Sequence, residues 1–327
     1  MSARLIVGLA LAMAVSCPLF AHAHPLAPVV LFVEEQGEDM LVRVKRARAQ
    51  PTGAAFEARV PAGCERVSPP TVTEAASYVI EQSRFRCSEG LAPGWAGAEF
   101  GVDGLSEAGV DAVVRVTLMD GSVSRGLLDR SEDVFIVPER GSLLTTTESF
   151  VRGGFSHLLG GLDHVLLVLG LVLLLGDPRR IFLALTAFTL GHGLSMCAAT
   201  FGWIVSSAYL AEIAIALTLL WLAREIVRHR EGPAGLRQPY VASFAVGLVH
   251  GLGFASAFAG AGMSGLDLGL ALGAFHVGIE LGQGLIVGAA LLLMWLARPH
   301  REPMQQLAGY ATGAIAFMWV IERVVQS

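Results

Sequence analysis

The pattern of hydrophobic and polar positions divides the chain near residue 150. Before that point, short apolar runs are separated by glycine and proline clusters. After it, long apolar segments follow one another with short polar connections, and each is near the length of about 20 residues that a helix needs to cross a bilayer. We therefore predict a six-helix transmembrane α bundle over residues 149–327, with its spans at 153–176, 180–200, 206–227, 240–261, 268–297 and 306–324.

Residues 24–148 have the pattern of a small all-β domain. Glycine and proline turns separate its apolar, β-branched runs, which lie at 29–33, 40–45 and 112–118. Several short strands separated by such turns are typical of an antiparallel sandwich. This half of the sequence contains no catalytic motif.

The N-terminus is typical of an export signal. Arg4 precedes an apolar run at 5–15, and the residues at 21–23 match an A-x-A cleavage site. The apolar run is too short to span a bilayer comfortably. We predict a signal peptide over residues 1–23, with an uncleaved anchor as the alternative. The β domain would then lie in the periplasm, attached to a multi-pass bundle in the bacterial inner membrane.

Two cysteines, Cys64 and Cys87, lie in the β half. An even pair in an oxidising compartment predicts a disulfide, and closing that loop would contribute about 3 kcal/mol in the chain-entropy model. A pair of thiolate metal ligands is the alternative, but the spacing is wide and no histidine accompanies it.

Composition and charge agree with this division. Hydrophobic residues make up 54% of the chain and charged residues 16%, against about 25% charged in soluble domains. These values exclude a disordered chain, a basic nucleic-acid binder and a fully soluble enzyme. If the β domain is exported, the connections that face the cytoplasm carry the arginines, as the positive-inside rule requires. They are Arg179, Arg180, Arg224, Arg228, Arg230, Arg237, Arg298 and Arg301.

Ionisable residues inside the predicted spans give the strongest indication of function. A charge at the bilayer centre costs about 2.5–3.5 kcal/mol on insertion scales, so such residues are usually functional. Counted along the spans from their outer ends, all of them lie about 6–18 Å deep. This predicts one polar layer in a cavity open to the periplasm. The residues are His157, Asp163, His164, His192, Glu212, His250, His276 and Glu280.

Imidazoles and carboxylates in one layer predict a site for a divalent transition metal. Such ligands suit nickel, cobalt, zinc or copper(II), whereas copper(I) would require more cysteine and methionine. His157 and His164 are seven residues apart and would share one face of a continuous helix. The predicted metal ligands are His157, Asp163, His164, His192, His250, His276 and Glu280.

Three polar residues of the layer have other interpretations. Glu212 and Gln283 are expected to orient the ligands or to carry protons. For His250, a hydrogen bond to a neighbouring helix is an equal alternative to metal binding. Glycine pairs four residues apart would let the helices approach closely, and they lie at 247/251, 269/273, 278/282 and 284/288.

At these residues the sequence resembles the HupE/UreJ family of membrane proteins. The resemblance is carried by GFSHLLGGLDH at 154–164, FTLGH at 188–192, GLVHGLGFA at 247–255 and GIELGQ at 278–283. It implies uptake of nickel or cobalt, and the exported β domain resembles the longer branch of the family. The His-x5-Asp-His pattern is also similar to the motif of nickel/cobalt permeases. Here His276 stands where the family usually has asparagine, and Gly193 where it usually has serine.

The sequence therefore predicts a metal transporter and not an enzyme. The ion would enter from the periplasm, bind the His/carboxylate layer and pass inward by alternating access. A membrane-embedded metallohydrolase is the first alternative, because an open position on the metal could activate water. A metal sensor or assembly factor is the second. The expected partners are the metal ion, the lipid bilayer and a periplasmic protein that binds the β domain, with no nucleic acid.

Overall fold

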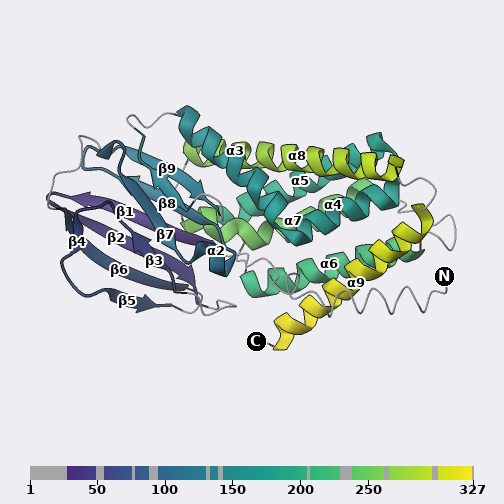
Figure 1. Cartoon of the computed structure of the whole chain (residues 1–327), viewed down its shortest axis with the longest axis horizontal. Coiled ribbons are helices and arrows are strands. Elements are labelled where there is room, and N and C mark those ends of the chain that lie inside the picture. Colours follow the sequence, from purple (N-terminus) through teal and green to yellow (C-terminus); the bar gives the residue numbers. More distant parts are fainter. Residues whose placement is uncertain are drawn as a thin grey trace.

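The computed structural model describes residues 28–48, 55–75, 78–87, 95–129, 133–138, 143–204, 207–228, 238–260, 265–296 and 301–325. A β-rich N-terminal region (the β region, 28–138) is followed by a helical C-terminal region (the helical region, 143–325), as the sequence predicts. Figure 1 shows the β region at one end of the helices, which run away from it. The predicted signal peptide at 1–23 lies outside the described residues.

Two sheets build the β region. The larger has the strand order β4-β6-β2-β1-β8-β9, with β5 also paired to β6, and the smaller has the order β10-β7-β3. The elements are β1 (Val29–Gln36), β2 (Asp39–Ala47), β3 (Glu57–Arg59), β4 (Cys64–Arg66), β5 (Thr71–Glu74), β6 (Tyr78–Cys87), β7 (Glu99–Asp103), α2 (Leu105–Ala108), β8 (Ala112–Thr117), β9 (Val123–Leu128) and β10 (Val134–Ile136).

The prediction of a purely antiparallel sandwich is wrong at one strand pair, because β1 and β8 run parallel. A parallel pair needs a long crossover, and the chain from β2 to α2 supplies it. The register aligns Val30 of β1 with Val113 of β8, and Val113 with Leu127 of β9. These three side chains form a single row across the larger sheet, which we call the docking row.

Alternation along β1 sends its side chains into two different cores. Val29 and Leu31 belong to the core of the β region itself. The docking row instead belongs to a buried cluster formed with the helical region, whose aromatic members are Phe150, Phe254 and Phe275. The N–H of Leu127 also donates to Oγ of Ser149 on the first long helix at 3.0 Å. The β region is therefore packed firmly onto the helices.

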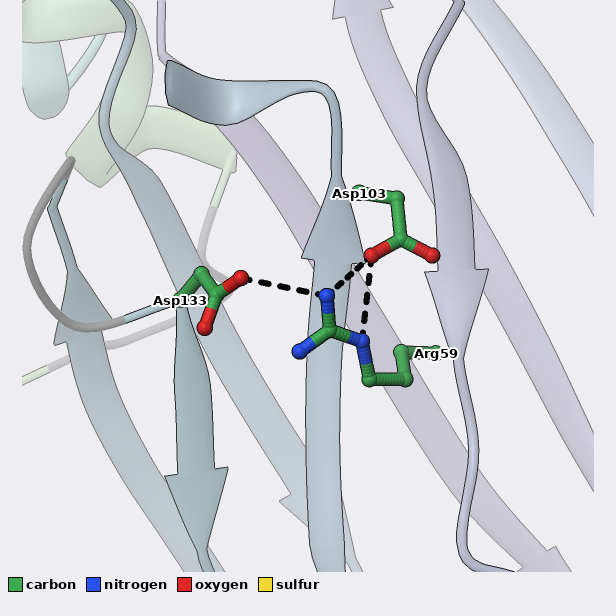
Figure 2. A network of polar contacts seen from close by, with 3 residues as sticks. All are labelled: Arg59, Asp103 and Asp133. Carbon is green, nitrogen blue, oxygen red and sulfur yellow. Dashed lines mark hydrogen bonds and ion pairs between the residues drawn. The ribbon is translucent and has the colours of Figure 1, made fainter.

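Covalent and polar links hold the outer strands. Cys64 on β4 lies directly opposite Cys87 on β6, and a disulfide joins them. In the smaller sheet the guanidinium of Arg59 lies between the carboxylates of Asp103 and Asp133 (Figure 2), donating to them at 3.0 and 3.1 Å. Hydrogen bonds to Asp103 and then Asp133 raise the pKa of Arg59. Because this network is exposed, its contribution to stability is small.

Seven helices form the described part of the helical region. They are α3 (Leu143–Gly160), α4 (Leu162–Leu175), α5 (Pro178–Thr200), α6 (Ala208–Arg228), α7 (Pro239–Gly260), α8 (Gly265–Leu296) and α9 (Arg301–Val325). By length and composition, α5, α8 and α9 can each cross a membrane, and the bent pair α3–α4 would make a fourth span. The helical region is thus supported as a membrane region, while the six-helix bundle stays a prediction.

The first predicted span, 153–176, is not one continuous helix. The axes of α3 and α4 differ by 74° at a break, where Gly161 has extended backbone and caps α4. A Cβ on Gly161 would lie 2.7 Å from Nδ1 of His164 and 2.9 Å from Oδ1 of Asp163. The missing Cβ of Gly161 therefore leaves room for the side chains of Asp163 and His164 beside the break.

Glycines also bring two pairs of helices into backbone contact. A Cβ on Gly251 of α7 would lie 2.1 Å from the carbonyl oxygen of His192 on α5, and one on Gly154 of α3 would lie 1.9 Å from that of Phe275 on α8. No side chain can occupy such a space, so these crossings require glycine.

The glycine pairs predicted along α8 are only partly used in this way. Gly278 and Gly282 face α3, where an added Cβ would lie 2.0 Å from Val151 O and 2.7 Å from Leu158 Cδ2. The other two pairs, 269/273 and 284/288, are exposed and have no described atom within 4 Å of an added Cβ. The spacing alone did not show which side of α8 meets another helix.

We predict that Cys64 and Cys87 resist thiol reagents in unreduced spheroplasts, because both sulfurs are in the disulfide. Labelling with and without a reductant measures this, and a Cys197→Ala background removes the free thiol of α5. Full labelling of both cysteines without reductant would contradict the disulfide.

We predict that Gly251→Ala destabilises the protein by about 1–3 kcal/mol, the usual penalty for overpacking, because its Cβ would collide with the backbone of α5. Thermal unfolding of the detergent-purified protein measures the effect. Gly273→Ala on the exposed face of α8 is the matched control, and its melting temperature should not fall. Equal melting temperatures for the two variants would show that α5 and α7 do not make this backbone contact.

Candidate metal centre

Five helices bring histidines together. They are His157 of α3, His164 of α4, His192 of α5, His250 of α7 and His276 of α8. The ring centroids lie 4.9 Å apart for His157–His164, 5.3 Å for both His164–His250 and His192–His276, and 6.1 Å for His164–His192. The structure therefore gathers all five predicted histidine ligands around one point.

Two overlapping sets of side chains within this cluster could hold a metal ion. His157, His164 and His192 form one set, and Asp163, His164 and His250 form the other; within each set the ligand atoms lie within 4.8 Å of one another. With metal bonds of about 2.0–2.2 Å, two ligand atoms of a tetrahedral site lie about 3.4 Å apart, and two opposite ligands about 4.2 Å apart. Either set would have to contract to bind an ion, and His164 belongs to both.

The centre is closed to solvent, which differs from the predicted cavity open to the periplasm. Asp163 is 7% exposed, and the histidines of the two sets are at most 2% exposed. Strands β1 and β8 contact α7, and β9 contacts α3. The β region, whose position the sequence could not predict, therefore covers this end of the helices.

The break between α3 and α4 sets the positions of three of these residues. His157 and His164 do not share a helix face, as a continuous helix would require, but face each other across the bend. Asp163 and His164 lie in the first turn of α4 and not in the middle of a helix. The positive end of the helix dipole at that turn favours the carboxylate of Asp163.

His276 lies beside His192 and fixes which nitrogen of His192 can bind metal. Nδ1 of His276 lies 2.7 Å from the carbonyl oxygen of Leu272; because a carbonyl only accepts, that nitrogen must donate. The neutral ring then has its lone pair on Nε2. This nitrogen lies 3.2 Å from Nδ1 of His192 and accepts a hydrogen bond from it. The lone pair of His192 is consequently on Nε2.

Similar contacts orient His250 and His164. The hydroxyl of Thr218 on α6 donates to the carbonyl of Ile215 at 2.7 Å and so accepts from Nε2 of His250 at 3.1 Å. Nδ1 of His164 donates to Oδ1 of Asp163 at 3.1 Å. These contacts leave the lone pairs on Nδ1 of His250 and Nε2 of His164. Such outer hydrogen bonds are what holds histidine ligands in place in metal sites.

The predicted residues Glu280 and Gln283 lie along α8, next to the cluster. Glu280 is within hydrogen-bonding reach of the hydroxyls of Thr186 and Thr189 on α5. Gln283 donates to Oγ1 of Thr189 at 3.2 Å. Neither residue belongs to the two metal-ligating sets. Together with His192 and His276, they form a polar strip between α5 and α8.

Glu212 was predicted to lie in the polar layer because of its depth, but in the structure it pairs with an arginine of α9. Its carboxylate accepts a hydrogen bond from Nε of Arg323 on α9 at 3.1 Å. The guanidinium of Arg323 is nearly buried and also lies over the ring of Trp319, at 5.7 Å from its centroid. Sequence reasoning overlooked Arg323, although an arginine within an apolar helix signals a buried acidic partner.

Sequence reasoning also missed Asp111, which lies in the β region. This residue is 5% exposed, and its Oδ2 lies 3.8 Å from Nδ1 of His157. A signal was present, because Asp111 lies two positions before Val113 at the start of β8 and so shares its face. Without knowing that this face meets the helices, the sequence could not connect Asp111 with His157.

A protein-family model described as HupE / UreJ protein matches residues 132–323, more than half of the chain. No curated protein gives a match to the chain. The matched residues include every histidine of the centre but not Asp111. The resemblance seen in the sequence is thereby confirmed, and the chain belongs to the HupE/UreJ family of membrane proteins.

Proposed function

We propose that this protein carries a divalent transition-metal ion across the bacterial inner membrane, with nickel or cobalt as its substrate. The observation that carries the proposal is the convergence of buried ring nitrogens from helices α3, α4, α5 and α7. The association of the HupE/UreJ family with nickel and cobalt transport supports the choice of metals. Imidazole and carboxylate ligands suit both ions.

The hydrogen bonding of the cluster supports metal binding over simple packing. Nε2 of His164, Nε2 of His192 and Nδ1 of His250 are buried, and none has a hydrogen-bond partner among the described residues. A buried acceptor without a partner is unfavourable by about 1–3 kcal/mol. An ion in either set would satisfy the acceptor of His164 together with that of His192 or of His250.

The surroundings of the cluster support movement of the ion rather than permanent storage. The polar strip between α5 and α8 leads from His192 through Thr189 toward the beginning of α5, where the predicted cytoplasmic residues Arg179 and Arg180 lie. The opposite side is covered by the β region. A centre closed to solvent in this way corresponds to the occluded state of an alternating-access carrier.

We predict that proteoliposomes containing the protein accumulate radioactive nickel or cobalt with time, and that Asp163→Asn and His164→Ala reduce this uptake to background. Each variant removes a candidate metal ligand from the set that contains Asp163, His164 and His250. Metal titration of the detergent-purified variants should show the matching loss of binding. Glu225→Gln is the control, since Glu225 pairs with Arg224 at 2.6 Å near the end of α6.

Two results would count against this proposal in different ways. Binding without any time-dependent accumulation would favour a metal-dependent enzyme or a sensor over a transporter. Affinity equal to that of the unmodified protein in both Asp163→Asn and His164→Ala would show that the metal binds elsewhere.

We predict that His276 orients His192 instead of binding the ion, so that His276→Ala lowers metal affinity by about 10–100-fold, as loss of such outer contacts does. His276→Asn should retain most of the affinity, because its amide oxygen can accept the proton of His192 Nδ1. Isothermal titration with nickel measures both variants. Equal, complete loss in the two would identify His276 as a ligand, and unchanged affinity in both would show that its contact with His192 is unimportant.

A further inference from the structure

Two buried apolar clusters mark the two ends of the helical region. The cluster that includes the docking row also contains Ala199, near the end of α5, and Leu268, near the beginning of α8. A second cluster contains Ile181, near the beginning of α5, and Met294, near the end of α8. We call the first the outer cluster, because it lies against the β region, and the second the inner cluster.

The two metal-ligating sets lie at different depths between these clusters. The ring of His157 lies 4.4 Å from that of Phe254, a member of the outer cluster. His250 is one turn before Phe254 on α7, and its ring lies 5.4 Å from that of Phe188, a member of the inner cluster. His192 lies between them, at 5.9 Å from Phe188. The set that contains His157 is therefore the outer set, and the set that contains His250 is the inner set.

His164 belongs to both sets, which limits how they can be filled. The ligand atoms of all five side chains in the two sets do not lie within 4.8 Å of one another in the described part of the chain, so one ion is not held by all of them together. A neutral imidazole has a single lone pair. His164 can therefore bind only one ion at a time, and a second ion would lack this ligand.

We infer that the transported ion occupies the outer set and then the inner set, with His164 bound to it in both positions. The inference rests on the metal transport proposed above and adds the path that the ion takes within the centre. The inward step exchanges His157 and His192 for Asp163 and His250. Because His164 is kept as a ligand, the ion is never released into the apolar surroundings, where an uncompensated charge is strongly unfavourable.

The test uses the full chain in detergent, with Co²⁺ as the probe because its visible absorption reports the ligand set. His157→Ala disrupts only the outer set, and His250→Ala disrupts only the inner set. Each variant should still bind one Co²⁺ per chain, as the unmodified protein should, but the absorption bands of the two variants should differ. His164→Ala should lose the bound Co²⁺, because it disrupts both sets.

Transport gives a second readout of the same variants. In proteoliposomes, uptake of radioactive cobalt should fall to background in both His157→Ala and His250→Ala, although each still binds the ion. His157→Gln and His250→Gln keep most of the side-chain volume and a polar group, and they replace the alanine variants if these do not fold. Asp163 cannot separate the two positions, because it also accepts a hydrogen bond from Nδ1 of His164.

Ser243→Ala is the matched control for a buried polar side chain of α7. Ser243 is 4% exposed, lies about two turns before His250 and belongs to neither set. Its variant should therefore keep the Co²⁺ spectrum and the cobalt uptake of the unmodified protein.

Several results would overturn the inference. Two Co²⁺ ions per chain in the unmodified protein would show independent sites. Identical spectra in His157→Ala and His250→Ala, or complete loss of binding in either, would show a single position. Uptake at the unmodified rate in either variant would show that transport does not need both positions. An unmodified protein that binds no Co²⁺, or that binds it without accumulating it, would instead refute the proposed function itself.

Discussion

The histidine cluster depends on one constraint, which is that a neutral imidazole buried away from water still has one donor and one acceptor to satisfy. The N–H groups of His192 and His250 donate to His276 and to Thr218, so each ring keeps one buried acceptor nitrogen. These acceptors have no hydrogen-bond partner among the described residues. A cation bound at them would satisfy them, as the proposed function requires.

This arrangement is possible only because the helices approach to backbone contact. Glycines at the crossings of α5 with α7 and of α3 with α8 bring the helix axes close enough for short side chains to meet. Gly161 has a different effect, because it lies at the break between α3 and α4 and its missing Cβ leaves room for the side chains of Asp163 and His164. The glycines of the motifs thus shape the site as much as the histidines do.

Much of this could be predicted from the sequence, since burial of an ionisable group in an apolar segment is unfavourable wherever it occurs. That argument identified all five histidines without any knowledge of contacts. It grouped Glu212 with them by depth, whereas the structure pairs the carboxylate of Glu212 with Arg323, because depth along a helix does not say which face is used. It also treated the apolar run around Gly161 as one helix, because the hydropathy of the run does not show the bend between α3 and α4. The parallel pairing of β1 with β8 depends on contacts between distant segments, which a local pattern does not contain. For the same reason the neighbourhood of Asp111 could not be found.

The position of the β region restricts how an ion could reach the histidine cluster or leave it. The β region packs onto the helices through the docking row, and the histidines of the cluster are closed to solvent. An ion would have to pass either by separation of the β region from α3 and α7, which it contacts, or along the polar strip between α5 and α8, where Glu280 lies at the threonine hydroxyls of α5. A bound ion would favour the closed arrangement only if it bound that arrangement more tightly than an open one.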